Sequence, residues 1–358
     1  MFYFLYPLRE HFIIFNLLRY ITFRSAYAAI TSLLLSLFFG RKLIAWLRRK
    51  NLTESISKWI KSTHGEKEGT PTMGGLLIIS SLLISVFLWC DITNRLILYL
   101  ISITIWMGVF GVLDDYLKIK RGEGFNVWTK IIIQVIPAGV IGLLLVLNPL
   151  RSGYETMTSS LFFKNVFINL GYFYIPFIML VIIGTTNAVN LTDGMDGLAI
   201  GLSSIIGGSF ALVAYIVGNV KFSDYLNILF INGTGEITVF CTAFLGSTIG
   251  FLWFNSQPAE IFMGDTGSLA IGGILGLIAV LLKQELLLPI IGGVFVIEAF
   301  SVILQVGSNK LRGKRILKMA PIHHHFHLRG WTEPKVVVRF WIWGIMFALL
   351  GLSTLKIR

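Results

Sequence analysis

Five of the seven aspartates in this chain lie in three short polar stretches, each of which follows a long apolar run. They are Asp114, Asp115, Asp193, Asp196 and Asp265. Carboxylates gathered from separate stretches of chain are typical of a site that binds a hard cation or handles protons. Helix N-capping is the alternative for a single aspartate, such as Asp193 or Asp265, but it does not account for all five together.

Asp114 and Asp115 are neighbours in the chain, and two like charges this close are both ionised only beside a cation or a basic group. One carboxylate could bind a metal ion or a lysine while the other accepts a proton; an interfacial turn is the simpler alternative. The stretch 190–197 adds Asn190, Asp193 and Asp196. It lacks the closing glutamate of an EF-hand calcium loop, so sugar, nucleotide or metal contacts are expected there instead.

Asn255, Phe262 and Asp265 belong to the next polar stretch, at 254–268. Asp265 is predicted to open a helix, whose N-terminal amides favour phosphate. A metal ion that bridges Asp265 and a diphosphate would fit the same place. Phe262 could stack on a base or, alternatively, anchor the chain at the membrane interface.

Two further stretches could contact anions. Four of the six histidines lie between residues 323 and 327. Three consecutive side chains point in different directions, so hydrogen bonds from the imidazole rings to phosphate oxygens fit this run better than a zinc site does. The stretch 67–75 carries Lys67 and Thr72 but lacks the ending of a P-loop, so we expect either an anion contact without ATP hydrolysis or simply a constrained entry to a helix.

The elements that must position these groups are membrane-spanning helices. The chain is 55% hydrophobic and only 13% charged, whereas soluble domains carry about 25% charge. A soluble enzyme and a disordered chain are therefore both excluded. We predict an all-α, polytopic membrane protein that forms a single domain over residues 1–358. Ten apolar stretches are candidates for its spans: 26–46, 73–90, 96–113, 131–148, 170–189, 199–218, 236–254, 267–282, 287–306 and 337–355.

Lys and Arg residues gather in the loops after the first, third and ninth of these stretches, which predicts that these loops are cytoplasmic. The five aspartates then lie on the cytoplasmic side, and both termini are predicted to be periplasmic. Membrane topology also accounts for the net charge of +12, so no nucleic-acid partner is expected. Cys90 and Cys241 lie inside apolar runs and are interpreted as small buried side chains.

With these motifs the chain resembles the phospho-N-acetylmuramoyl-pentapeptide transferases, a bacterial branch of the polyprenyl-phosphate N-acetylhexosamine-1-phosphate transferase superfamily. The run 320–325 is the most specific part, because it is similar to this branch rather than to the wider superfamily. The resemblance covers nearly the full length, through the segments 69–75, 113–118, 187–199, 251–255, 262–270, 298–312 and 319–331.

The resemblance implies a magnesium-dependent transfer of phospho-N-acetylmuramoyl-pentapeptide from its UDP carrier to undecaprenyl phosphate, which gives lipid I and UMP in peptidoglycan synthesis. It implies a multi-pass protein of the bacterial inner membrane among membrane lipids, with a cytoplasmic active site and a homodimer as one possible assembly. The rival interpretations are a transferase for N-acetylglucosamine 1-phosphate and a cation-coupled transporter. The transporter is disfavoured because Glu298 is the one acid deep in a predicted span and no internal repeat is visible.

The resemblance also implies residue roles by matching position. Asp265 matches a magnesium ligand, and Asp114 and Asp115 match an essential pair near the lipid phosphate. We assign Asp114 as the general base of a one-step attack, supported by Asp115, against a competing mechanism with a covalent intermediate. The further matches are a catalytic histidine at His324, active-site positions at Asn190, Asp193, Asn255 and His325, and uridine-pocket positions at Lys67, Asp196 and Phe262; Thr72 is an expected substrate contact.

Overall fold

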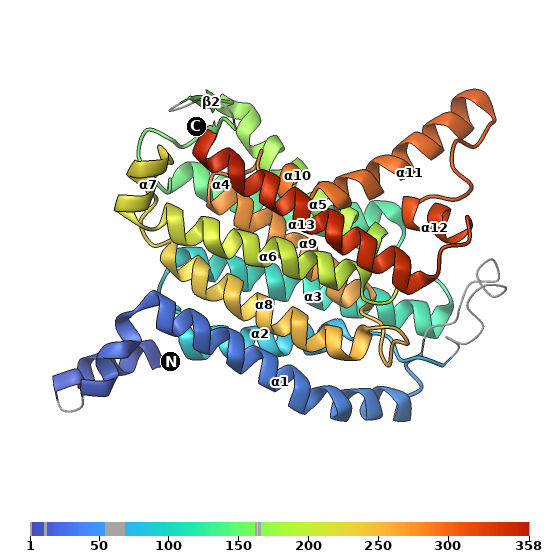
Figure 1. Cartoon of the computed structure of the whole chain (residues 1–358), viewed down its shortest axis with the longest axis horizontal. Coiled ribbons are helices and arrows are strands. Elements are labelled where there is room, and N and C mark those ends of the chain that lie inside the picture. The colour runs from blue at the N-terminus through green and yellow to red at the C-terminus, as the bar shows by residue number, and fades with distance from the viewer. Residues whose placement is uncertain (1, 11–12, 54–68, 162, 164–165, 358) are drawn as a thin grey trace.

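The body of the molecule is a bundle of long helices that run side by side (Figure 1). The computed structural model describes residues 2–10, 13–53, 69–161, 163 and 166–357. Within these ranges the bundle has ten helices: α1 (Ile21–Arg49), α2 (Gly75–Trp89), α3 (Arg95–Arg121), α4 (Val127–Leu147), α5 (Tyr174–Thr192), α6 (Leu198–Val217), α8 (Gly235–Asn255), α9 (Gly264–Leu281), α11 (Gly293–Arg312) and α13 (Glu333–Ile357).

The predicted all-α membrane fold is confirmed, because each apolar stretch corresponds to one of these helices. In the described part of the chain, nine helices are long and apolar enough to cross a membrane, and α2 is shorter at 15 residues. One boundary was wrong: the predicted span 287–306 is divided into a single turn, α10 (Leu288–Ile291), and α11. The consecutive glycines Gly292 and Gly293 weaken the helix at this point, and α11 leans away from the bundle (Figure 1).

Helix α9 lies at the centre of the packing, and it is buried along its whole length from Asp265 onward. It packs mainly against α3 and α5. A Cβ atom at Gly111 of α3 would overlap the backbone of Asp265, and one at Gly272 of α9 would overlap the backbone of Thr186. Small residues let helix backbones approach closely in a membrane. The glycines therefore let α3 and α5 approach α9 closely, and the backbone of Asp265 lies directly against α3.

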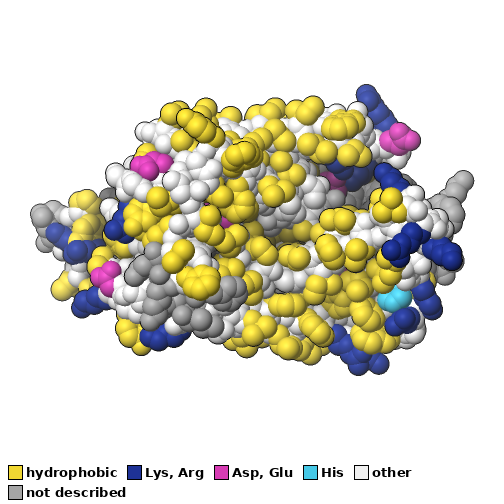
Figure 2. Space-filling model, turned by 90° about the horizontal axis from the view of Figure 1, so that it is seen from above, with side chains coloured by type: hydrophobic (Ala, Val, Ile, Leu, Met, Phe, Trp, Pro, Cys, Tyr) yellow, Lys and Arg dark blue, Asp and Glu magenta, His cyan; other side chains and the backbone are white. Residues whose placement is uncertain are grey.

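The outer surface of the bundle is apolar. Figure 2 shows hydrophobic side chains over the middle of the molecule and Lys and Arg side chains toward its two ends. Exposed apolar residues occur on the outer helices, for example Phe38, Leu180 and Leu349. A continuous apolar belt between charged ends is the surface that a lipid bilayer would cover.

The described chain begins and ends at one end of the bundle, and the short helix α12 (Ile322–His327) lies at the other (Figure 1). We call these the hairpin end and the α12 end. The hairpin consists of β1 (Met157–Ser159) and β2 (Phe167–Asn169), which pair antiparallel. The remaining short elements are η1 (Phe2–Glu10), η2 (Ile13–Arg19), η4 (Gly171–Phe173) and α7 (Val220–Leu226).

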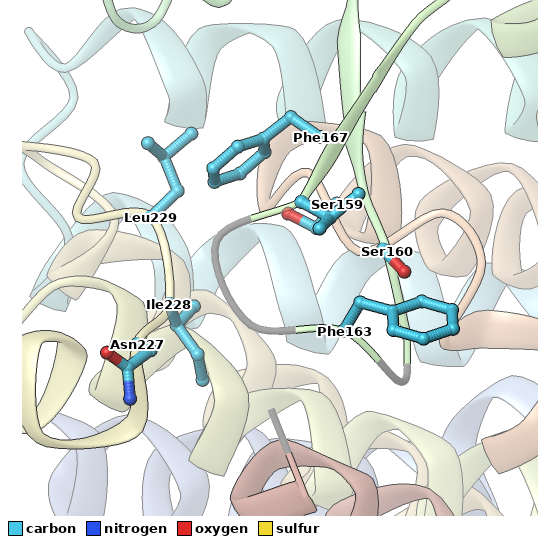
Figure 3. Close-up of a pocket in the computed structure, with 8 residues that line it drawn as sticks. Ser159, Ser160, Phe163, Phe167, Asn227, Ile228 and Leu229 are labelled. Atoms are coloured by element: carbon cyan, nitrogen blue, oxygen red, sulfur yellow. The ribbon is translucent and has the colours of Figure 1, made fainter.

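A small cavity lies beside the hairpin, between β1, β2 and residues 227–229 (Figure 3). Ser159, Phe167 and Leu229 are among the residues that line it. Its volume of about 10 Å³ is close to what one water molecule needs. The cavity is therefore too small to hold a substrate.

A buried polar network joins the hairpin to the link between α9 and α10. The carboxylate of Glu285 accepts hydrogen bonds from Thr158 Oγ1 at 2.6 Å and from Tyr174 OH at 2.8 Å. The ammonium group of Lys283 donates to Tyr174 OH at 2.8 Å and to the carbonyl of Glu155 at 3.1 Å. Because buried polar groups are costly unless they are paired, this network fixes the hairpin against the bundle.

The network gives the fold a predicted pH dependence. Burial lowers the pKa of Lys283 to about 8 from an ordinary 10.5, although the nearby carboxylates of Glu285 and Glu155 oppose the shift. Between these two values the unfolded chain binds more protons than the folded chain, so stability should rise with pH, by up to about 3 kcal/mol. Thermal unfolding in detergent from pH 7.5 to 10.5 measures this rise. The Lys283→Met variant should lack it, and an equal rise in both proteins would refute the prediction.

Candidate active site

Three buried carboxylates meet at the α12 end of the bundle. Asp114 and Asp115 lie near the end of α3, and Asp265 lies in the first turn of α9. One oxygen atom from each lies within 4.8 Å of the others. Two of the three acidic stretches recognised in the sequence are thus brought into direct contact, although about 150 residues separate them.

Asp115 caps helix α9 from outside. Its Oδ1 atom accepts a hydrogen bond from the backbone N–H of Asp265 at 2.9 Å. Its Oδ2 atom accepts from the backbone N–H of Thr266 at 2.9 Å and from the hydroxyl of Thr266 at 2.7 Å. These donors are otherwise unpaired at a helix N-terminus. Asp115 therefore fixes the first turn of α9 and, with it, the position of Asp265.

Two lysines bridge the other two carboxylates. The Nζ atom of Lys130, at the start of α4, lies 2.8 Å from Asp114 Oδ2 and 2.6 Å from Asp265 Oδ2. The Nζ atom of Lys118 lies 3.0 Å from each of the same oxygens. The second oxygen of Asp114 accepts the backbone N–H of Phe125. Asp114 and Asp265 are thus paired with two ammonium groups, whereas neither lysine forms an ion pair with Asp115.

The sequence analysis did not single out either lysine as a site residue. Lys118 stands four residues after Asp114 on α3, a spacing that places two side chains on the same face of a helix. That signal could have been used. Lys130 is 135 residues from Asp265 and belongs to another helix, so no local pattern indicates their contact.

Asn190 joins the cluster from the end of α5. Its side-chain N–H donates to Asp265 Oδ1 at 2.9 Å and to the hydroxyl of Ser268 at 2.8 Å. Asp265 therefore has one oxygen held by an amide and the other held by the two lysines. Asn190 orients the Asp265 carboxylate.

Asp196 and Asn255 form hydrogen bonds that connect two loops, the one after α5 and the one after α8. The Asn255 side chain accepts from the backbone N–H of Gly197 at 3.1 Å and donates to the carbonyl of Ile261 at 2.9 Å. Asp196 Oδ2 accepts from the backbone N–H of Ala259 at 3.1 Å. Both side chains are buried. They join the loop after α5 to the loop after α8.

The predicted histidines lie on the short helix α12. The ring of His324 packs on His323, with 4.1 Å between the ring centres, and is partly exposed. His325 is buried, and its Nδ1 atom accepts the backbone N–H of Lys318 at 3.0 Å. Burial, together with the positive charges of Arg329 and Lys318, lowers the pKa of His325.

Of the remaining predicted residues, Asp193 directly follows α5, and Phe262 and Thr72 lie around the start of α2. The backbone of Phe262 donates to the carbonyl of Pro71 at 2.8 Å and accepts from the N–H of Gly74 at 2.8 Å, and its side chain is half-buried. Thr72 is buried close to the start of α9. Lys67 lies outside the described residues.

Comparison with known proteins decides the family. The family model described as Glycosyl transferase family 4 matches residues 97–283, and the Phospho-N-acetylmuramoyl-pentapeptide-transferase signature 1 matches residues 67–79. The phospho-N-acetylmuramoyl-pentapeptide-transferase of Desulforapulum autotrophicum is 50% identical over 361 residues, which cover 100% of both chains. The proteins with this name from Oleidesulfovibrio alaskensis and Thermodesulfovibrio yellowstonii are 48% and 49% identical over 100% and 99% of both chains.

The chain belongs to the phospho-N-acetylmuramoyl-pentapeptide-transferase family. In this family member, the signature segment enters α2 and packs against the start of α9. The N–H of Gly75 donates to the carbonyl of Met263 at 2.9 Å, next to the bond between Gly74 and Phe262. The start of α2, within the signature segment, is thus hydrogen-bonded to the backbone just before Asp265.

The carboxylate cluster of this transferase could bind a divalent metal ion. Carboxylate oxygens are the ligands that Mg²⁺ prefers, and three of them lie within 4.8 Å of one another. Both oxygens of Asp115 already accept hydrogen bonds from α9. Asp114 and Asp265 are bridged by ammonium groups, so the space between them accepts positive charge. The residues present therefore fit a divalent metal ion, and they include Asp265, the expected ligand.

Proposed function

We propose that this chain transfers phospho-N-acetylmuramoyl-pentapeptide from its UDP carrier to undecaprenyl phosphate, with release of UMP and formation of lipid I. The observation that carries the proposal is the buried cluster of Asp114, Asp265, Lys118 and Lys130 at one end of a membrane bundle. One substrate is a lipid phosphate and the other a water-soluble nucleotide, so the reaction requires charged groups at the membrane surface. The names of relatives matched over their full length support the same reaction.

We place the α12 end of the bundle at the cytoplasmic face of the bacterial inner membrane. The support is the predicted bias of Lys and Arg toward the loops at this end. In this orientation both termini, at the hairpin end, are periplasmic. The whole chain then acts as one membrane domain, because helices from its first and last thirds pack on the same bundle.

Repulsion between the incoming lipid phosphate and the diphosphate is the main barrier to the transfer. Mg²⁺ held by Asp265 would supply charge neutralisation worth several kcal/mol. Lys118 and Lys130 would move from the carboxylates to phosphate oxygens, since both ammonium groups are partly exposed. That movement leaves Asp114 free to accept a proton from the lipid phosphate, whose oxygen then attacks the β-phosphorus as the bond to UMP breaks.

Asp115 supports this chemistry by position rather than by proton transfer, because both of its oxygens already hold the first turn of α9. The competing mechanism makes a carboxylate the covalent nucleophile. The stereochemistry of the β-phosphorus separates the two mechanisms. Inversion at a chiral β-phosphorus is expected for direct attack, whereas retention would indicate a phospho-enzyme and overturn the one-step mechanism.

Phe262 is proposed to stack on the uracil base of the donor. The Phe262→Ala variant should therefore raise KM for the UDP donor by about tenfold and leave kcat within about threefold, since base stacking contributes roughly 1–3 kcal/mol. Initial rates at varied donor concentration measure both constants. The Phe262→Tyr variant keeps a ring of similar size and should behave like the wild type. An unchanged donor KM in Phe262→Ala would remove this residue from the nucleotide pocket.

Release of radiolabelled UMP tests the function directly. We expect release that depends on a polyprenyl phosphate and on Mg²⁺, with the muramoyl-pentapeptide donor preferred to UDP-N-acetylglucosamine. A strict preference for the acetylglucosamine donor would favour the related transferase. Ion flux in vesicles that lack any lipid acceptor would favour a transporter. The particle mass in detergent distinguishes a monomer from a homodimer.

A further inference from the structure

Helices α11 and α12 meet at two ionisable side chains with no exposed surface. Nδ1 of His323 lies 3.1 Å from Oε2 of Glu298, and both side chains are 0% exposed. A carboxylate in such a place is tolerated only with a partner, because burial of an unpaired charge is very costly. The sequence analysis assigned no role to Glu298 or to His323.

The pair is incompletely satisfied. Oε1 of Glu298 and Nε2 of His323 are buried and have no hydrogen-bond partner among the described residues. Apolar side chains of the same volume are often as stable as a buried ion pair, and a partly satisfied polar pair is worse than an apolar core. Stability therefore does not explain why these two residues are present. A function in the neighbouring site does.

The far side of His323 lies against Gly194, in the loop that carries Asp193 and Asp196. A Cβ atom at Gly194 would overlap Nε2 of His323 and would lie 3.3 Å from Nε2 of His324. The rings of His323 and His324 are in contact, with 4.1 Å between their centres. His323 is thus packed between Glu298 on one side and, on the other, His324 and the loop that contains Gly194.

A carboxylate that accepts the Nδ1 proton of a histidine fixes the tautomer and the orientation of its ring. We propose that Glu298 is a positioning residue for the transfer reaction. It holds His323, and the His323 ring holds His324 beside the 193–196 loop, where His324 donates a hydrogen bond to a phosphate oxygen of the donor. This inference rests on the proposed function, because it gives His324 a substrate to contact.

A double-mutant cycle tests the inference through kcat and KM. Glu298→Ala should lower kcat by about 10–100-fold, as the loss of an orienting partner does elsewhere, and leave the donor KM within about twofold. The second variant, His324→Gln, keeps an N–H donor so that turnover remains measurable. In that background Glu298→Ala should change kcat less than about threefold, because residues that act through one another have non-additive effects.

A matched control lies at the hairpin end. Arg24, which is buried, and Glu236, which is partly buried, form another acid–base pair, with two hydrogen bonds between their side chains. Glu236→Gln removes one charge of that pair and should lower the thermal midpoint without lowering kcat. A drop in kcat for Glu298→Ala at an unchanged donor KM, with no such drop for Glu236→Gln, separates positioning from a general loss of stability.

The outcomes are distinct. An equal fold loss from Glu298→Ala in both backgrounds, or a wild-type kcat in that variant, overturns the positioning role. If Glu298→Ala does not fold, Glu298→Met fills a similar volume without a strong acceptor for the Nδ1 proton and enters the same cycle with the same criteria. A wild-type protein that releases no UMP from the muramoyl-pentapeptide donor refutes the proposed function itself, before any variant is compared.

Discussion

Asp265→Asn is expected to reduce UMP release by about 10³-fold or more while the protein remains folded in the membrane. The substitution removes the negative charge that would bind the metal ion, and each 1.36 kcal/mol of lost transition-state stabilisation costs about tenfold in rate. The folded state should persist, because the shape of the side chain is kept and the backbone of residue 265 still donates to Asp115. Turnover at varied Mg²⁺ concentration, with thermal unfolding of the same sample, measures both effects.

The control for Asp265→Asn is Asp224→Asn, which removes an exposed aspartate of α7 at the hairpin end. It should change neither the rate nor the dependence on Mg²⁺. A near-normal rate in Asp265→Asn would show that Asp265 is not the metal ligand. A loss of rate in both variants would show that net charge, rather than this position, controls turnover.

Asp114→Asn is the second large effect that we expect. A general base contributes about 10²–10⁴-fold, so kcat should fall by that factor while the donor KM changes little. An amide cannot accept the proton, and it also releases Lys118 and Lys130 from one of their two carboxylates. Initial rates with saturating lipid phosphate give kcat, and pre-steady-state release of UMP isolates the chemical step.

Asp115→Asn is the informative comparison for Asp114→Asn, since the two residues are adjacent but differ in their contacts. An amide at residue 115 places an N–H group against the donors of α9, so the thermal midpoint should fall along with the rate. Asp114→Asn should lower the rate with a smaller loss of stability. If the two variants lose stability equally, the division between a base and a helix cap is wrong.

The sequence predicts the helices well because a membrane imposes a length and a composition on each span. The exceptions are local. Gly292 and Gly293 end one helix and start another, which an apolar average over 287–306 cannot show. The hairpin is too short and too polar to give a strand pattern of its own, and Thr158 is held in place by Glu285, a residue 127 positions away.

The site was predictable where one residue type stands out against an apolar background. Aspartates near the ends of apolar runs indicated a charged site, and Asp114, Asp115 and Asp265 lie together as expected. Residues that act through tertiary contact were not predictable in the same way. Lys130, on α4, contacts Asp265, on α9. Glu298 contacts His323, and no rule of sequence spacing predicts this pair.

The tight packing of α9 has a consequence for inhibition. Asp265 stands on a helix whose neighbours approach so closely that a single methyl group at Gly111 or Gly272 would collide with a backbone. A drug that engages Asp265 therefore binds a residue whose helix is closely packed by its neighbours. Resistance would have to arise in the surrounding loops, where a side chain can change without displacing the scaffold.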